Sequence, residues 1–260
     1  MKKTLLTLLF FAVAAGSSAK ERIISQSPFI TYTLQYLGVD DHIVGVSRYD
    51  FLDLPKTGGI IDPDGEAIAR LEPDIIFTSD WTDPKVLHAV TPENAEAVIL
   101  HGFKGMGEVE ESIIEISQVL GIPDGRRRAA EFSAEWRRAA AEVHGDGKRT
   151  LILSSCAGSP FSFGRKTYIY ELFTAAGFNV VENYPTIRHL NKSEEFRTVA
   201  ELVRLTSPDV IFVLHDSAHG CVVPLEGAKC HVVELNGEHF VYPAPQILKG
   251  LKDLKAWKKL

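Results

Sequence analysis

Residues 66–80 read EAIARLEPDIIFTSD, and residues 201–216 read ELVRLTSPDVIFVLHD. In both stretches a glutamate opens an apolar helical pattern, a proline follows seven residues later, and an aspartate and an apolar run come next. Proline cannot continue a helix and biases the residue before it away from the helical conformation. The apolar run has the composition of a buried parallel strand. The repeat therefore predicts the same helix-to-strand joint in both halves of the chain.

Strand and helix patterns alternate around the first copy, with short joints between them. Pro28 suits the first position of a helix, and Gly38 suits the left-handed residue that follows one. Such alternation is typical of parallel βαβ units. We expect strands at 23–24, 42–49, 75–77 and 97–101, and helices at 28–38, 62–71, 85–90 and 109–120.

The alternation is interrupted in the middle of the chain. Residues 124–144 are rich in Ala, Arg and Glu, with Phe132, Trp136, Ala140 and Val143 close to one helical face. A helix of this length spans roughly 30 Å. It is either one more surface helix of an α/β domain or a strut that connects two lobes, and its central position favours the strut.

The alternation then restarts and repeats the order of the first half. We expect strands at 149–154, 178–181, 210–214 and 231–235, and helices at 167–176, 198–205 and 245–258. The predicted fold class is therefore α/β, with two Rossmann-like lobes that have mainly parallel sheets and are joined by a single long helix. The expected divisions are a signal peptide at 1–19, an N-terminal lobe at 20–123, the connecting helix at 124–147 and a C-terminal lobe at 148–260.

The first 19 residues have the pattern of a cleaved signal peptide. Two lysines precede a short apolar run, and Ser17-Ser18-Ala19 supplies the small residues at which a signal peptidase cleaves. The apolar run is shorter than the roughly 20 residues that span a membrane, and a buried N-terminal helix is the alternative. With no cysteine near the cleavage site, we expect no lipid anchor. These features predict a soluble periplasmic protein whose mature chain begins near Lys20.

The mature chain would be acidic and would fold without covalent or metal staples. It has 26 basic and 34 acidic residues, a net charge of −8, which disfavours nucleic-acid binding. A hydrophobic content of 45% over this length can form a sizeable core. Export permits a disulfide, and Cys221 and Cys230 are close enough in sequence to close a short loop, which leaves Cys156 unpaired.

No motif of an enzyme is evident. The sequence has no GxSxG nucleophile elbow and no phosphate-binding P-loop. Asp74 and Asp209 directly follow the prolines of the repeat, at the start of strands, and are expected to be structural. We therefore predict that the protein is not an enzyme. An exported metal-dependent α/β hydrolase that uses the histidines of the last third remains an alternative.

The ordered set of segments resembles the helical-backbone class (class III) of periplasmic substrate-binding proteins of ABC importers, which bind cobalamin, ferric siderophores or haem. The resemblance covers nearly all of the mature chain, and its length is most similar to that of the cobalamin binders. It rests on RIISQSPFITYTLQYLG, VGVSRY, EAIARLEPDIIFTS, the helix at 124–144, SPFSFGRKTYIYELFTAAG, ELVRLTSPDVIFVL and the final PAPQIL.

This resemblance implies a function and a set of partners. The protein would capture a cobalamin-like corrinoid or a related metal chelate between two lobes and deliver it to a dimeric permease and its ATPase. A ferric siderophore, haem, or a small metal complex or oxyanion are alternatives. The protein would have no cofactor of its own and would be a monomer. Glu66 and Glu201 match the glutamates with which the family docks on its permease, although each could instead only stabilise a helix N-terminus.

The ligand is expected at the carboxyl ends of the strands, in loops rich in aromatic and histidine residues. By the resemblance, Tyr49 and Phe161 fall where the cobalamin binders place aromatic contacts, and Trp81 lies two residues beyond a common tryptophan position. His215 ends a strand and is the candidate metal ligand. The full set of candidate ligand-binding residues is Tyr49, Trp81, Phe161, Phe163, Arg165, His189, His215, His239 and Phe240.

Overall fold

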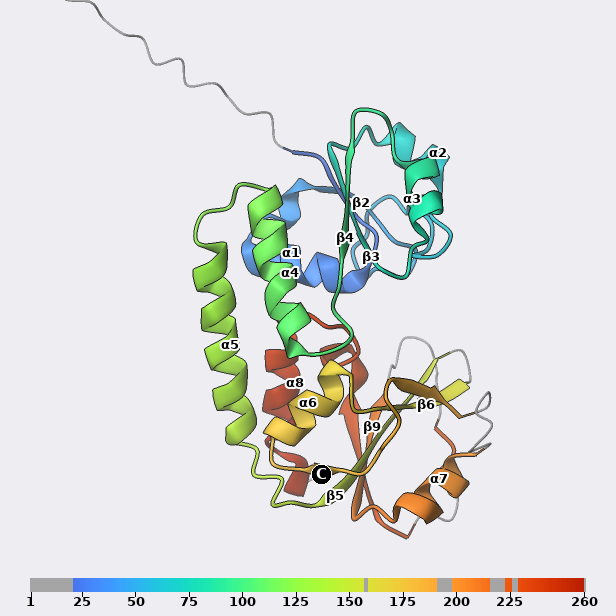
Figure 1. The fold of residues 1–260 in the computed structure, drawn as a ribbon, viewed down its shortest axis with the longest axis vertical. Coiled ribbons are helices and arrows are strands. Elements are labelled where there is room, and N and C mark those ends of the chain that lie inside the picture. The colour runs from blue at the N-terminus through green and yellow to red at the C-terminus, as the bar shows by residue number, and fades with distance from the viewer. Residues whose placement is uncertain (1–20, 157–158, 191–197, 216–222, 226–228, 260) are drawn as a thin grey trace, which may run out of the picture.

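A computed structural model describes residues 21–156, 159–190, 198–215, 223–225 and 229–259. The predicted signal peptide at 1–19 lies outside these ranges. Two lobes lie one above the other, and the long helix α5 (Gly125–Ala141) runs beside both of them (Figure 1). Within the described ranges, no helix combines the length and the apolar character needed to cross a membrane.

The N-terminal lobe is built on a four-stranded sheet in which every pairing is parallel, in the order β2-β1-β3-β4. Helices α1 and α4 share the core on one face of this sheet, and α5 packs against α4 on the same side, while α2 and α3 cover the opposite face (Figure 1). The strands are β1 (Ile23–Ser25), β2 (Ile43–Val46), β3 (Ile75–Ser79) and β4 (Glu96–Leu100). The helices are α1 (Pro28–Leu37), α2 (Gly65–Arg70), α3 (Pro84–Val90) and α4 (Met106–Val119).

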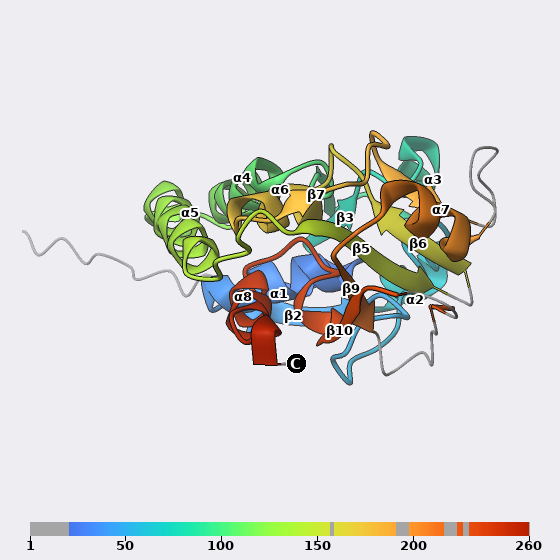
Figure 2. The same cartoon turned by 90° about the horizontal axis from the view of Figure 1, so that it is seen from below.

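The C-terminal lobe has a mixed sheet in the order β10-β9-β5-β6-β8, with β7 also paired to β5. Helices α6 and α8 lie on the α5 side of this sheet, and α7 lies on the other side (Figure 2). The strands are β5 (Arg149–Cys156), β6 (Ser159–Phe163), β7 (Asn179–Val180), β8 (Ile187–His189), β9 (Val210–His215) and β10 (His231–Asn236). The helices are α6 (Tyr168–Ala175), α7 (Val199–Thr206) and α8 (Ile247–Leu254).

The predicted two-lobed α/β fold is confirmed, with three local corrections in the second lobe. Residues 159–163, expected as a loop, form β6, which pairs antiparallel with β5 and with the unexpected β8. The closing helix, expected over 245–258, is limited to α8. Beyond α8 the chain turns inward, and the ring of Trp257 contacts Phe178 at 5.3 Å between centroids.

The repeated sequence forms the same joint in both lobes, down to individual atoms. The backbone N–H of Arg22 donates to the Asp74 carboxylate at 2.7 Å, and its guanidinium donates to the carbonyl of Leu71 at the end of α2. In the second lobe the backbone N–H of Arg149 donates to the Asp209 carboxylate at 2.9 Å. The guanidinium of Arg149 likewise donates to the last carbonyls of α7. An arginine and an aspartate therefore tie each helix end to the start of the neighbouring strands.

The residue before each proline leaves the helix in the same way. Glu72 and Ser207 both have φ of 44°, in the left-handed region, and the prolines after them are buried. A left-handed residue ends a helix because it turns the backbone out of the helical path. The aspartates that follow are structural, as the sequence indicated, because each accepts a hydrogen bond from the backbone N–H at the start of the first strand of its lobe, Arg22 directly before β1 and Arg149 in β5.

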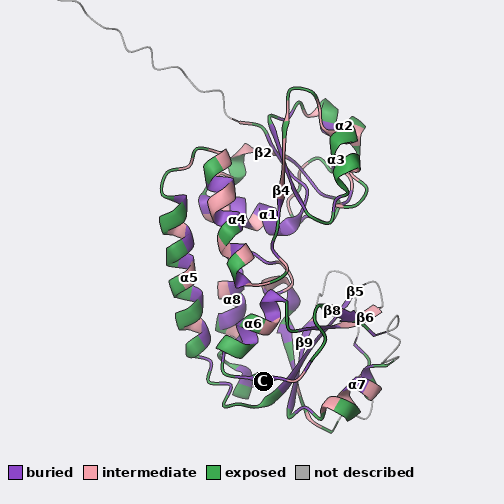
Figure 3. Ribbon diagram, in the orientation of Figure 1, coloured by how far each residue is buried: buried purple, intermediate pink, exposed green. Residues whose placement is uncertain are grey.

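One large hydrophobic core runs through both lobes and includes the inner face of α5. The outer face of α5 is exposed along its length (Figure 3). Phe132 and Trp136 are buried in this core, and the Trp136 indole N–H donates to Glu110 of α4 at 2.9 Å. The helix is therefore fixed to both lobes by side-chain packing, which a flexible linker would not provide.

Candidate ligand-binding site

Exposed hydrophobic side chains concentrate at the carboxyl ends of the strands in the first lobe. Tyr49, Phe51 and Ile61 lie in the loop after β2, and Trp81 lies just after β3. They are 58%, 46%, 71% and 51% exposed, respectively. Among the described residues, the other exposed large hydrophobic side chains are Leu205 and, less exposed, Tyr184. Such a cluster of apolar surface marks a binding site more often than a random surface does.

The Trp81 side chain is half-exposed, and a stacking contact fixes its orientation. Its ring stacks on Phe103, with centroids 4.5 Å apart and planes 22° apart. Phe103 in turn meets Tyr168 of α6 edge-on at 6.3 Å, so it bridges the two lobes. The half-exposed indole therefore presents a pre-oriented flat surface beside the contact between the lobes.

The buried carboxylate of Asp50 anchors the loop after β2. Thr31 donates to Asp50 at 2.6 Å, and the backbone N–H of Leu52 donates to the same carboxylate. Burial raises the pKa of Asp50, and these hydrogen bonds oppose that shift. On either side of Asp50, Tyr49 and Phe51 project to the surface, and Phe51 stacks on Tyr32 at 4.2 Å. The anchored backbone thus fixes two exposed aromatic rings.

The lobes meet along a seam beside the exposed aromatic residues. Tyr32 of α1 lies 5.9 Å from Tyr242 of the second lobe, and the backbone N–H of Met106 donates to Glu171 of α6 at 2.8 Å. Burial, with the negative charges of Glu238 and Asp50, raises the pKa of Tyr32 to about 12. Both lobes therefore touch through ordered side chains as well as through α5.

In the second lobe, Phe161 and His189 are brought together. They are direct partners on β6 and β8, with ring centroids 5.8 Å apart. Ser162 and Arg188 form the next pair of this ladder, and both side chains reach the buried carboxylate of Glu182. The Arg188–Glu182 ion pair is buried, with 3.1 Å between Nη2 and Oε1, and it fixes β8 against β6.

The other predicted ligand residues differ in where they lie. Phe163 is buried, and its ring meets that of Phe161 edge-on, with 5.4 Å between centroids. Phe240 is buried in the core, where its ring lies 6.0 Å from that of Phe173. His239 is half-buried, and its Nδ1 pairs with Asp253 of α8 at 2.6 Å. His215 is half-buried at the end of β9, and Arg165 is exposed in the turn after β6.

Sequence reasoning missed a second histidine–carboxylate pair. Nδ1 of His101, just after β4, lies 2.7 Å from Asp80, just after β3. The sequence signal was available, because both residues directly follow strands and precede the aromatic residues Trp81 and Phe103. Among the residues that the structure describes, no group of three or more His, Cys, Asp or Glu side chains is arranged to hold a metal ion.

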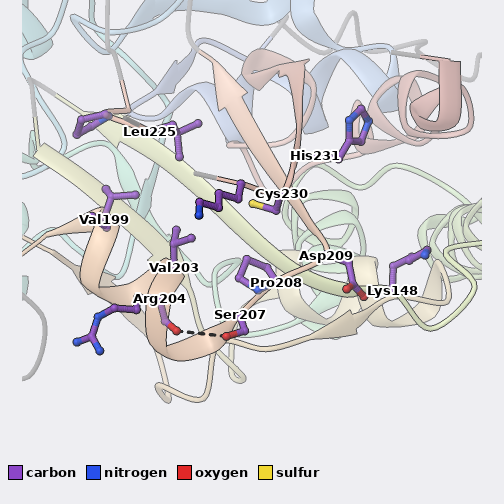
Figure 4. A pocket seen from close by; sticks show the side chains of 13 residues that line it. Lys148, Val199, Val203, Arg204, Ser207, Pro208, Asp209, Leu225, Cys230 and His231 are labelled. Atoms are coloured by element: carbon purple, nitrogen blue, oxygen red, sulfur yellow. Dashed lines mark hydrogen bonds between the residues drawn. The ribbon is translucent and has the colours of Figure 1, made fainter. Parts of the chain in front are cut away.

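A separate cavity of about 950 Å³ lies at the other end of the second lobe (Figure 4). It is bordered by α7 and by the amino ends of β9 and β10, and none of the predicted ligand-binding residues lines it. Cys230 lies in its wall, half-buried and without a disulfide to any described residue, and burial raises the pKa of its thiol. Cys221 lies outside the described residues, so the predicted disulfide stays a prediction.

The two candidate docking glutamates lie in the first turns of their helices but at different positions. Asp64 caps α2 two residues before Glu66, whereas Thr198 caps α7 three residues before Glu201. Glu66 is 92% exposed and lies 3.7 Å from Arg70. Glu201 is half-buried, and its backbone N–H donates to Thr198. Both positions favour a carboxylate electrostatically, so helix stabilisation alone could account for either residue.

Comparison with solved structures shows the fold of class III periplasmic binding proteins. A periplasmic haem-binding protein, RhuT, from Roseiflexus sp. RS-1 is 22% identical, with a TM-score of 0.74 over 91% of this chain and 97% of that one. The periplasmic vitamin B12-binding protein BtuF of Vibrio cholerae is 19% identical, with a TM-score of 0.71 over 92% and 96%. The periplasmic haem-binding protein HutB of Vibrio cholerae is 16% identical, with a TM-score of 0.74 over 92% and 98%. No protein-family model and no curated sequence matches the chain.

Proposed function

We propose that this protein is a periplasmic solute-binding protein that captures a cobalamin-like corrinoid or a related metal chelate between its lobes and delivers it to an ABC importer. The proposal is carried by the exposed aromatic side chains at the carboxyl ends of the first-lobe strands. Large flat ligands bind through aromatic walls with few polar anchors. In this reading the protein catalyses no reaction and acts as a monomer in the periplasm.

Two arginines next to the predicted aromatic and histidine contacts are already paired, which favours a ligand with little net negative charge. The Arg48 guanidinium pairs with Asp62 at 2.6 Å, and Arg188 pairs with Glu182. Cations that are already neutralised contribute little to holding a carboxylate or a propionate. This supports a corrinoid over an anionic siderophore or haem, which remain the alternatives together with a small metal complex or oxyanion.

Tryptophan fluorescence provides a direct test because the three tryptophans differ in exposure. Trp81 is half-exposed, whereas Trp136 and Trp257 are 2% and 6% exposed. We expect cyanocobalamin, haem or a ferric siderophore to quench the emission with a dissociation constant below about 10 μM, roughly −7 kcal/mol. Because these coloured ligands also quench buried tryptophans by energy transfer, Trp81→Phe should reduce the quenching amplitude without removing it, and equilibrium dialysis measures whether the ligand still binds.

The alternatives give different results in the same preparation. A protein that binds a small metal complex or an oxyanion would give a heat of binding with nickel–histidine or molybdate in a calorimetric titration. It would give no fluorescence response to the large chelates. A metal-dependent hydrolase would bind none of these ligands and would turn over an ester or amide substrate when a divalent metal is added. Either outcome would refute the proposed ligand class.

Permease docking through Glu66 and Glu201 is part of the same proposal. We expect the double substitution Glu66→Ala with Glu201→Ala to abolish uptake in cells and to leave ligand affinity unchanged. A control with two other exposed glutamates, Glu93→Ala with Glu234→Ala, should transport normally. Normal uptake by the first double variant would show that these glutamates only stabilise their helices.

A further inference from the structure

The amino end of α4 in the first lobe is capped by a residue of the second lobe. The N-cap position of α4 is Gly105, which has no side chain to accept the free backbone N–H groups of the first turn. Instead, the backbone N–H of Met106 donates to Oε2 of Glu171, in the first turn of α6, at 2.8 Å. We call this hydrogen bond the interlobe cap, and it lies where α4 and α6 meet (Figure 1).

The glycine at the N-cap position leaves room for this carboxylate. A Cβ atom at Gly105 would lie 3.1 Å from Glu171 Oε2, which is closer than an ordinary van der Waals contact. The backbone of Gly105 is extended, with φ of 178°, so its conformation does not itself require glycine. The carboxylate also lies at the positive ends of two helix dipoles, that of α4 and that of its own helix. Gly105 and Glu171 are therefore complementary across the seam.

The segment just before α4 is attached to the same second-lobe helix. The backbone N–H of Tyr168, the first residue of α6, donates to the carbonyl of Phe103 at 3.4 Å, and the two rings meet edge-on. Tyr168 is itself buried, and its hydroxyl donates to the carbonyl of Phe240 at 2.8 Å. Residues 103–106 are therefore hydrogen-bonded to the second lobe at both of their ends.

The same segment supports the exposed indole of Trp81. The Phe103 ring stacks on that indole, with 4.5 Å between centroids, and meets Phe29 of α1 edge-on at 5.7 Å. The support of Trp81 is thus in contact with α1 of the first lobe and with α6 of the second. A displacement of α6 from α4 would move Phe103, and the indole stacked on it would lose its fixed orientation.

Helix stability alone does not require a cap from the other lobe. The Glu108 carboxylate, within α4, already accepts the backbone N–H of Lys104 at 2.9 Å. Among the described helices, the others with a capping side chain take it from the residue directly before their own first turn; these caps are Asp64, Asp83, Thr167 and Thr198. The interlobe cap therefore joins the two lobes at a place where a local side chain would have sufficed for the helix.

We propose that Glu171 is a positioning residue of the ligand-binding surface, because it attaches the support of Trp81 to the second lobe. This inference rests on the proposed function and deepens it, since it names a second-lobe residue that orders a first-lobe aromatic wall. Glu171→Ala should weaken binding of the chelate by about 3- to 10-fold, because an aromatic ring that is ordered before binding loses less conformational entropy when the ligand arrives. The loss should appear mainly as faster dissociation.

Fluorine NMR of protein labelled with fluorotryptophan tests the attachment without any ligand. Trp81→Phe identifies the signal of Trp81 among those of the three tryptophans. Glu171→Ala should shift or broaden this signal and leave the other two in place. Glu171→Gln keeps an acceptor oxygen for the Met106 N–H, so its Trp81 signal should stay close to that of the wild type.

Two controls separate the attachment from helix stability. Thr198→Ala removes a cap within the second lobe and, like Glu171→Ala, should lower the unfolding midpoint by about 2–4 °C, but it should not change the Trp81 signal. Adding Gly105→Asn to Glu171→Ala gives α4 a cap from its own lobe. This double variant should recover the midpoint and not the Trp81 signal.

The outcomes distinguish this inference from the proposed function. An unchanged Trp81 signal in Glu171→Ala, or full recovery of that signal with Gly105→Asn, would overturn the attachment whether or not a chelate binds. Equal affinities of the wild type and Glu171→Ala for cyanocobalamin and haemin would overturn the positioning role and leave the proposed function intact. If neither chelate binds the wild type, the proposed function fails and the positioning role fails with it, while the NMR signals still decide the attachment.

Discussion

The two lobes share one structural joint but differ in their sheets, in their exposed loops and in their ion pairs. In each, an arginine and an aspartate tie a helix end to the first strand through corresponding hydrogen bonds. Beyond the joint, the first lobe has a small parallel sheet with exposed aromatic loops, whereas the second extends its sheet with antiparallel strands around a buried ion pair. The comparison teaches that the repeated sequence specifies the shared joint of the two lobes, whereas the loops and the added strands differ between them.

The largest expected difference between the lobes concerns their ion pairs. Glu182→Ala removes the buried carboxylate that pairs with the Arg188 guanidinium and should lower the free energy of unfolding by about 3–5 kcal/mol. In the first lobe, Asp62→Ala breaks the exposed pair with Arg48 and should cost less than about 1 kcal/mol. Urea unfolding of both variants measures the contrast. Equal costs would mean that the second-lobe pair does not stabilise β6 and β8 as argued.

The next prediction compares how much an exposed side chain of each lobe contributes to ligand affinity. Trp81→Ala should weaken binding of the captured chelate by about 2 kcal/mol, close to 30-fold, because it removes a pre-oriented aromatic wall. The matched control Leu205→Ala removes an equally exposed apolar side chain from α7 of the second lobe and should leave affinity unchanged. Calorimetry with the ligand identified by fluorescence gives both values. A larger loss for Leu205→Ala would move the site away from the first lobe.

The smallest expected effect tests the similarity of the two helix-to-strand joints. Arg22→Ala and Arg149→Ala each remove hydrogen bonds from an exposed guanidinium to the last carbonyls of a helix. Each should lower the free energy of unfolding by roughly 1–2 kcal/mol, and the two values should agree closely because the joints match atom for atom. Thermal unfolding of the two variants compares them. A difference above about 1 kcal/mol would show that one joint contributes much more than the other.

Most of the scaffold could be predicted from sequence because it is encoded locally. The proline of each joint, the glycine after α1 and the apolar runs specify helix ends and buried strands without reference to distant residues. β6 and β8 were missed because each is stabilised by the other, about 25 residues away, and by Glu182 between them. A pairing of that kind leaves no periodic pattern in so short a strand.

The exposure of the candidate site residues could be predicted in part. Tyr49 and Trp81 are exposed as expected because they follow strands, a position that can be read from sequence. Phe240 also follows a strand, but its chain turns inward against α6, which depends on tertiary packing. The positions of His101 and Asp80 directly after strands could be read from sequence, but their pairing depends on β3 and β4 being neighbours in the sheet.

The rigid connection between the lobes has a consequence for competition between empty and loaded protein. With α5 buried against both lobes and a seam of aromatic contacts beside it, the separation of Glu66 and Glu201 would change little when a ligand enters. A permease that binds both lobes would then bind nearly the same surface whether or not the carrier holds a ligand. Empty and loaded carriers would compete for it, and the import rate would depend on their relative abundance.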